Sequence, residues 1–142
     1  MYKLLISFIF IILYLIPGLS FSDGIDTRPA TSGSGIVAGS IHIPEGSRLP
    51  ADAVLRVELR DVSLMDVAAK RIAGQVITPL DAMPVDFAIA YDPDQIDERF
   101  SYSIFAQIRR GEKLLFVSDR SYPVLTRGHG SQVNLMLKAI SP

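Results

Sequence analysis

From residue 36 onward, apolar and polar residues alternate with a period of two. The clearest segment is 55–60, where leucine and valine alternate with arginine and glutamate. Successive side chains of a strand point to opposite faces, so this pattern predicts a strand with one buried face. The same alternation predicts further strands within 37–43, 85–91, 102–108 and 133–139.

Two further segments are less regular. Residues 113–118 form a nearly continuous apolar run, and Arg110-Gly111 joins them to the preceding strand as a tight hairpin connection. Residues 70–77 are expected to form a strand, although 63–73 could instead form a short helix capped by Ser63. With turn-forming residues between the segments, the pattern predicts an all-β fold: a single seven-stranded antiparallel β-sandwich.

The first 22 residues have the composition of a signal peptide. Lys3 precedes an uncharged apolar run over 4–16, and the small residues Ser20 and Ser22 place a cleavage site before Asp23. The run is short for a membrane span. We therefore expect export to the periplasm, with an inner-membrane anchor through residues 4–16 as the alternative.

A flexible linker is expected after the leader. Residues 23–35 are rich in glycine, serine and threonine and show no apolar rhythm. The folded domain is then expected to span 36–140.

Charge and cysteine content exclude several classes of function. The chain has 14 Lys plus Arg against 15 Asp plus Glu, a formal net charge of -1, so nothing in it favours nucleic acid as a partner. It contains no cysteine. Disulfides, thiolate metal sites and an acylated lipoprotein cysteine are therefore all excluded within these residues.

Groups for catalysis or metal binding are few. His42 alternates with isoleucines on a predicted strand, and His129 lies between two glycines, so neither is well placed to act as a general base. Asp92, Asp94 and Asp97 have a spacing that partly resembles a calcium loop, but the required glycine and terminal glutamate are out of register. We expect no catalytic residue, no metal and no cofactor.

The predicted outer faces are more informative. If the alternation is correct, four apolar residues point away from the core, on strands that could be neighbours. Either a loop covers them or they form an apolar patch that binds a partner. These candidate partner-binding residues are Phe105, Leu115, Val117 and Met136.

Several motifs together resemble a known family. They are Leu49-Pro50-x-x-Ala53-x-Leu55-x-Val57-x-Leu59-x-Asp61-Val62-Ser63-x-x-Asp66, Phe87 with Tyr91-Asp92, Leu114-Leu115-Phe116-x-x-Asp119 and Tyr122-Pro123-Val124-Leu125-Thr126. Over about 36–140 the chain is similar to the YbaY/YscW family of bacterial envelope lipoproteins. The resemblance implies a seven-stranded β-sandwich without catalytic residues.

For the YscW branch, the resemblance also implies a pilotin role, in which a small chaperone binds the C-terminal tail of a secretin and escorts it to the outer membrane. Members normally carry a lipid on a cysteine after the signal, which this sequence lacks. We thus expect a non-enzymatic envelope binding protein, pilotin-like chaperone or assembly factor, whose partner is an envelope protein such as a secretin segment. A small-ligand or glycan-binding module is the alternative, and a hydrolase using His42 or His129 is a remote third reading.

Overall fold

A computed structural model describes residues 33–141, which belong to one compact unit. The predicted leader and residues 23–32 of the predicted linker lie outside the described residues. Among those described, no helix is long and apolar enough to cross a membrane.

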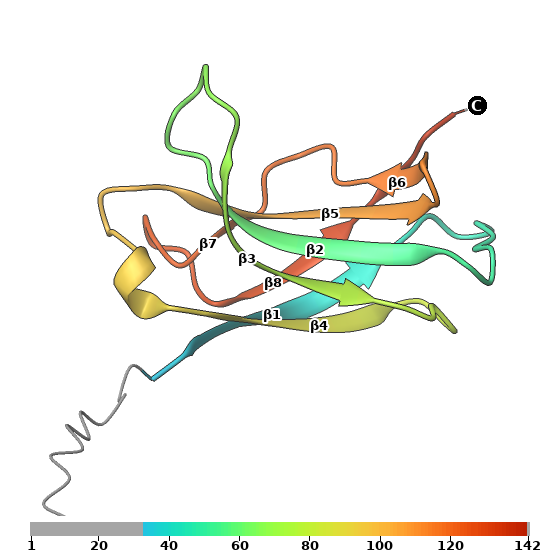
Figure 1. The fold of residues 1–142 in the computed structure, drawn as a ribbon, viewed down its shortest axis with the longest axis horizontal. Helices are drawn as coiled ribbons and strands as arrows, with labels where there is room; N and C mark the ends of the chain where they lie inside the picture. Colours follow the sequence, from blue (N-terminus) through green and yellow to red (C-terminus); the bar gives the residue numbers. More distant parts are fainter. Residues whose placement is uncertain (1–32, 142) are drawn as a thin grey trace, which may run out of the picture. The chain divides into compact units, whose positions relative to one another are not determined.

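Two sheets pack face to face as a β-sandwich (Figure 1). The smaller has the order β4-β1-β8, and the larger has the order β3-β2-β5-β6-β9, with β7 paired to β5. The elements in chain order are β1 (Gly35–His42), β2 (Val54–Asp61), β3 (Lys70–Ile77), β4 (Val85–Tyr91), a 3-10 turn η1 (Pro93–Gln95), β5 (Tyr102–Arg110), β6 (Lys113–Val117), β7 (Pro123–Val124), β8 (Gln132–Met136) and β9 (Lys138–Ala139).

All seven predicted strands are present, and the β-sandwich is confirmed. Residues 63–73 form no helix: residues 62–69 are a loop that projects from the sheets, and β3 follows it (Figure 1). Three details differ from the prediction. The short strand β7 was not predicted. β1 and β8 pair in parallel rather than antiparallel. The last predicted strand divides at Leu137, with β8 in the smaller sheet and β9 in the larger one.

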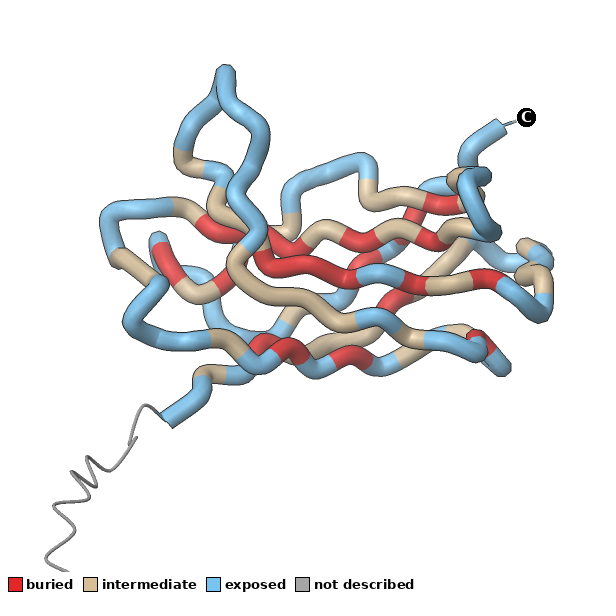
Figure 2. The backbone as a smooth tube through the Cα atoms, in the orientation of Figure 1, coloured by how far each residue is buried: buried red, intermediate tan, exposed pale blue. Residues whose placement is uncertain are grey.

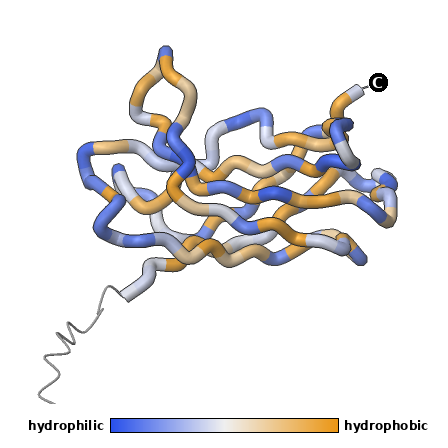
Figure 3. The backbone as a smooth tube through the Cα atoms, viewed as in Figure 1, coloured by the Kyte–Doolittle hydropathy of each residue, from blue (hydrophilic) through white to orange (hydrophobic). Residues whose placement is uncertain are grey.

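The core lies between the sheets, where the inward residues of most strands are buried, while β3 and β9 contain no buried residue (Figure 2). The alternation of hydropathy along the strands accounts for this burial of one face (Figure 3). The largest fully buried side chains are Tyr102, Ile41, Leu55, Leu59, Ile89, Ile104, Ile108, Leu135, Leu137, Val37, Val57 and Val124.

Side chains complete the hydrogen bonding at the edges of the smaller sheet. On β4, Ala88 N–H donates to Gln75 Oε1 of β3 at 3.0 Å, which ties the two sheets together. On β8, the Tyr122 hydroxyl accepts from Met136 N–H and donates to Met136 C=O, both at 3.0 Å. At these points the edges are already hydrogen-bonded within the chain.

Candidate functional site

Two of the four candidate partner-binding residues share one surface. Phe105 on β5 and Val117 on β6 both point to the outer side of the larger sheet, since Val117 is opposite Gln107, two residues from Phe105. Diagonal neighbours of this kind are about 7–8 Å apart, within reach of an aromatic side chain. Both side chains are half-buried.

The other two residues lie elsewhere. Between β5 and β6 the register shifts, so that Ile108 is opposite Phe116 while Arg109 is opposite Leu114. Leu115 is the extra residue of this bulge and packs against the core, and Leu114 takes the outward position. Met136 is 49% exposed, but it belongs to β8 in the other sheet. The structure therefore does not bring the four side chains onto one surface.

An arginine covers the Phe105 ring. The guanidinium carbon of Arg60 lies 3.8 Å from the ring centroid, and the same guanidinium pairs with Glu58 at 2.6 Å. Glu58 is directly opposite Phe105 on the neighbouring strand and is only 8% exposed. The aromatic ring and the carboxylate together fix this arginine in place.

A second arginine reaches Glu58 from the other side. Arg71 on β3 has its Nε 3.7 Å from Glu58 Oε1. Gly74 is directly opposite Glu58, and a Cβ at Gly74 would lie 2.8 Å from Arg71 Nη2. The missing side chain of Gly74 thus leaves the space in which the Arg71 guanidinium lies.

The outer face of the larger sheet carries more positive than negative charge. We define this surface as the outward-pointing strand residues of β3, β2, β5, β6 and β9. Its apolar members include Val76, Phe105 and Val117, and its one carboxylate is Glu58. Its cations are Arg56, Arg60, Arg71, Arg109 and Lys138. The whole chain is nearly neutral, so its charges are unevenly distributed.

Sequence analysis missed the cationic character of this face. The alternation of Arg56, Glu58 and Arg60 places all three on the outer side of β2, which is the signal that was available. The addition of Arg71 depends on the register shift between β2 and β3, and that of Arg109 depends on the pairing of β5 with β2.

His42 belongs to a polar array on the smaller sheet. Its Nε2 is 2.8 Å from Ser40 Oγ, and the Ser40 hydroxyl donates to Asn134 Oδ1 at 2.9 Å. Ser40 N–H also donates to Asn134 Oδ1, at 3.2 Å, which fixes the orientation of the amide. Because the hydroxyl has a single proton and gives it to Asn134, His42 Nε2 must be the donor to Ser40. In this arrangement His42 cannot activate Ser40 as a nucleophile.

His129 and the aspartates near η1 serve local structure. His129 N–H donates to Thr126 C=O in an exposed loop. Asp92 Oδ1 accepts from Asp94 N–H and so caps η1. Within residues 33–141 no three potential metal ligands cluster.

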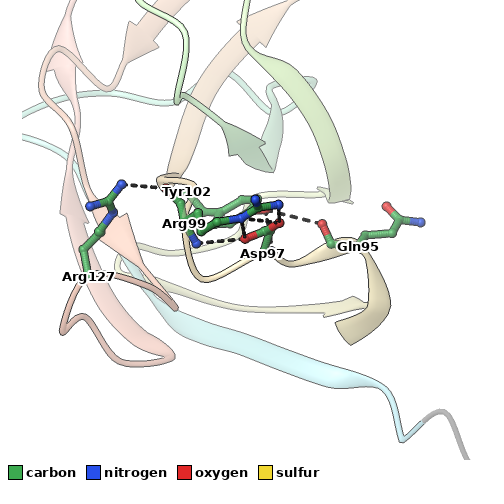
Figure 4. Close-up of polar contacts among 5 residues, drawn as sticks. All are labelled: Gln95, Asp97, Arg99, Tyr102 and Arg127. Atoms are coloured by element: carbon green, nitrogen blue, oxygen red, sulfur yellow. Dashed lines mark hydrogen bonds and ion pairs between the residues drawn. The ribbon is translucent and has the colours of Figure 1, made fainter.

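Asp97 joins a network that ties the β4–β5 connection to the core (Figure 4). Its carboxylate accepts from Arg99 Nη2 at 2.7 Å and from Arg99 N–H at 2.9 Å. These hydrogen bonds, the side-chain ones first, lower the pKa of Asp97 to about 2. The Tyr102 hydroxyl accepts from Asp97 N–H at 3.0 Å, and Arg127 donates to Arg99 C=O.

A cavity of about 590 Å³ lies at one end of the sandwich. The β1–β2 and β3–β4 loops form it, with polar groups from His42, Glu45 and Asp81. The other residues that line the cavity include Ile43, Leu49, Leu80 and Met83. No phenylalanine, tyrosine or tryptophan lines it. It therefore lacks the aromatic platform typical of a glycan site.

Comparison with known proteins gives consistent results. Residues 33–137 match the family model of the type III secretion system lipoprotein chaperone (YscW). The uncharacterized lipoprotein YbaY of Escherichia coli is 32% identical over 102 residues, which cover 71% of this chain and 53% of YbaY. The chain thus spans about half the length of that relative. An alternative pilotin from the type II secretion system of Vibrio cholerae superposes with a TM-score of 0.73 and 35% identity, over 77% of this chain and 99% of the pilotin.

Proposed function

This chain belongs to the YscW family of type III secretion system lipoprotein chaperones, and from that premise we propose that it is a non-enzymatic binding protein of the bacterial envelope. In this role it acts as a pilotin-like chaperone or assembly factor for a secretion or outer-membrane component. The specific partner we propose is a protein segment such as the C-terminal part of a secretin. The names of its relatives support this class of function: one is a lipoprotein and another is a pilotin of a secretion system.

The observation that carries the proposal is the half-buried Phe105 and the side chains that surround it on the outer face. An aromatic ring, the arginine stacked on it and several aliphatic side chains lie together on a hydrogen-bonded sheet. Aromatic residues and arginine are the residue types that most often dominate the binding energy of protein interfaces. Because both are already positioned, little conformational entropy is lost when a partner binds.

Phe105 and Val117 are the candidate partner residues that belong to this surface. Leu115 packs against the core and Met136 lies on the other sheet, so we assign the contact to the first two. The Ser40–His42 geometry supports a role without catalysis, since the histidine acts as a donor there.

The test is capture of the partner from envelope extract. The tagged protein, exported and purified from the envelope, is incubated with crosslinked extract, and captured proteins are identified by mass spectrometry. We expect a secretion-system or outer-membrane component among them. Phe105→Asp should reduce its capture by at least about tenfold, as for loss of an interface hot spot.

Phe100 offers a matched control. Its ring is 42% exposed and has Arg99 5.8 Å from its centroid, but it lies in the loop before β5 and not on the outer face. Phe100→Asp should leave capture unchanged. Since Phe105→Asp places a carboxylate opposite Glu58, Phe105→Ala is compared as well. If folded Phe105 variants still capture the component, this surface is not the binding site.

Export is the second part of the proposal. We propose that residues 1–22 are removed and that the mature protein is periplasmic. N-terminal sequencing of the protein recovered from the periplasmic fraction should begin at Asp23. A full-length form in the membrane fraction would instead support the anchor through residues 4–16.

A further inference from the structure

A small cleft on the outer face of the larger sheet lies between two arginines. It has a volume of about 190 Å³ and is lined by Val54, Arg56, Arg109 and Gly111. The register explains its position. Val54 is directly opposite Arg109, and Arg56 is two residues further along β2, so both arginine side chains leave the same side of the sheet.

Neither arginine has an acidic partner among residues 33–141. The ion pairs of this face join Glu58 to Arg60 and Arg71, so Glu58, two residues from Arg56 along β2, pairs with those arginines and not with Arg56. Arg109 donates from Nη2 to Glu112 C=O at 2.7 Å, which holds its side chain without neutralising it. The cleft therefore has two guanidinium charges, one of them held in position by the hairpin turn.

We propose that this cleft binds a carboxylate of the partner segment, an acidic side chain or a chain terminus. A guanidinium donates two parallel hydrogen bonds that match a carboxylate, and two of them around one cleft favour an anion strongly. The inference rests on the proposed function, because it specifies the chemistry of the partner that the outer face binds.

The surroundings of the cleft favour a protein segment over other anionic partners. Val54 lines the cleft itself, Val76 is directly opposite Arg56 and is 55% exposed, and Val117 is opposite Gln107 in the same row. Apolar and cationic positions thus alternate over a distance of a few residues. A segment that carries acidic and aliphatic side chains fits this pattern, whereas a nucleic acid backbone would leave the valines without contacts.

The two arginines that pair with Glu58 and the two arginines that line the cleft have different roles. Glu58 already neutralises part of the charge of Arg60 and Arg71, and Phe105 stacks on Arg60. The carboxylate that pairs with these two arginines is supplied by the chain itself. Arg56 and Arg109 lack such a carboxylate, so the partner must provide it.

The experiment uses an array of 12-residue peptides of random sequence. Each peptide is present in two forms, one with its carboxylates intact and one with amides in place of every Asp, Glu and C-terminal carboxylate. The tagged protein purified from the envelope is the probe, and its binding to both forms is measured. We expect bound peptides to combine acidic with aliphatic residues, and their amide forms to bind at least about tenfold more weakly.

Variants of the cleft test the assignment. Arg56→Gln and Arg109→Gln should each abolish the difference between the acidic and amide forms. Arg48→Gln is the matched control, because Arg48 is exposed in the β1–β2 loop and does not line this cleft. It should keep the difference. Thermal melts of all three variants show whether the fold is retained.

Several outcomes would overturn the inference. They are equal binding of both peptide forms, discrimination that persists in both cleft variants, and tighter arginine-dependent binding to phosphatidylglycerol vesicles or single-stranded DNA. Envelope capture repeated with Arg56→Gln separates the two proposals. If a secretion component is captured equally well, the inference fails and the proposed function stands. If no such component is captured but the peptide discrimination is observed, the proposed function fails and the carboxylate site stands.

Discussion

Gly39 allows β1 and β8 to pair, and its replacement by alanine should destabilise the whole domain. Gly39 is opposite Val133 in the parallel pair. A Cβ added at Gly39 would lie 1.6 Å from the Val133 carbonyl oxygen and 3.1 Å from Phe87 Cε1. Non-bonded atoms of this kind do not approach closer than about 3 Å, so the backbone of β8 would have to move by more than about 1 Å.

The expected cost follows from what holds β8. Its inner edge bonds to β1, and its outer edge is held at Met136 by the Tyr122 hydroxyl. A shift away from β1 weakens backbone hydrogen bonds, each worth about 1 kcal/mol, and loosens the packing of Leu135 in the core. We expect Gly39→Ala to lower the free energy of unfolding by about 3 kcal/mol, and Tm by at least about 10 °C.

Urea and thermal unfolding followed by circular dichroism provide the assay. Gly130→Ala is the matched control, because a Cβ there has no atom within 4 Å and its φ is not in the left-handed region. The control should change the free energy of unfolding by less than about 0.5 kcal/mol. A Gly39→Ala protein as stable as this control would refute the close parallel pairing of β1 and β8.

Three further predictions concern single side chains. Tyr102→Phe should cost about 1–2 kcal/mol in urea unfolding, because it leaves the Asp97 N–H without its acceptor; an unchanged midpoint would exclude that role. Arg99 lowers the pKa of Asp97 from 3.8 to about 2, so the stability from this carboxylate is complete above about pH 4 and is lost as the pH falls toward 2. In Asp97→Asn the loss of stability between about pH 4 and pH 2 should be smaller than in the unmodified protein, and an equal loss in both proteins would contradict the assignment. His42→Ala and His129→Ala should leave partner capture intact. Loss of capture in a folded variant would contradict the prediction that neither histidine has a functional role.

Residue alternation was sufficient to predict five of the strands, because burial of one face imposes the same period wherever such a strand lies. Leu135 and Leu137 show the limit of this signal. Both are fully buried, yet β8 and β9 belong to opposite sheets. Since the core lies between the sheets, a strand that crosses from one to the other can keep its apolar residues inward. The period therefore does not reveal which sheet a segment joins.

The candidate surface was harder to predict, because it depends on register rather than on period. A single extra residue in β6 exchanges the orientations of Leu114 and Leu115. Met136 was expected beside Phe105, but the crossing of the chain at Leu137 places it on the other sheet.

The arrangement around Glu58 shows why such a surface cannot be predicted from the sequence of one strand. Along β2, the alternation of arginine and glutamate is typical of a solvated strand face, on which an ion pair contributes little to the free energy of unfolding. In the fold, Gly74 makes room for Arg71, and Phe105 supports Arg60, so that Glu58 is almost fully buried between two arginines. The same strand leaves Arg56 beside Arg109 with no carboxylate between them. One residue type on one strand face thus has two different electrostatic environments, and the difference arises from the neighbours that β3 and β5 supply.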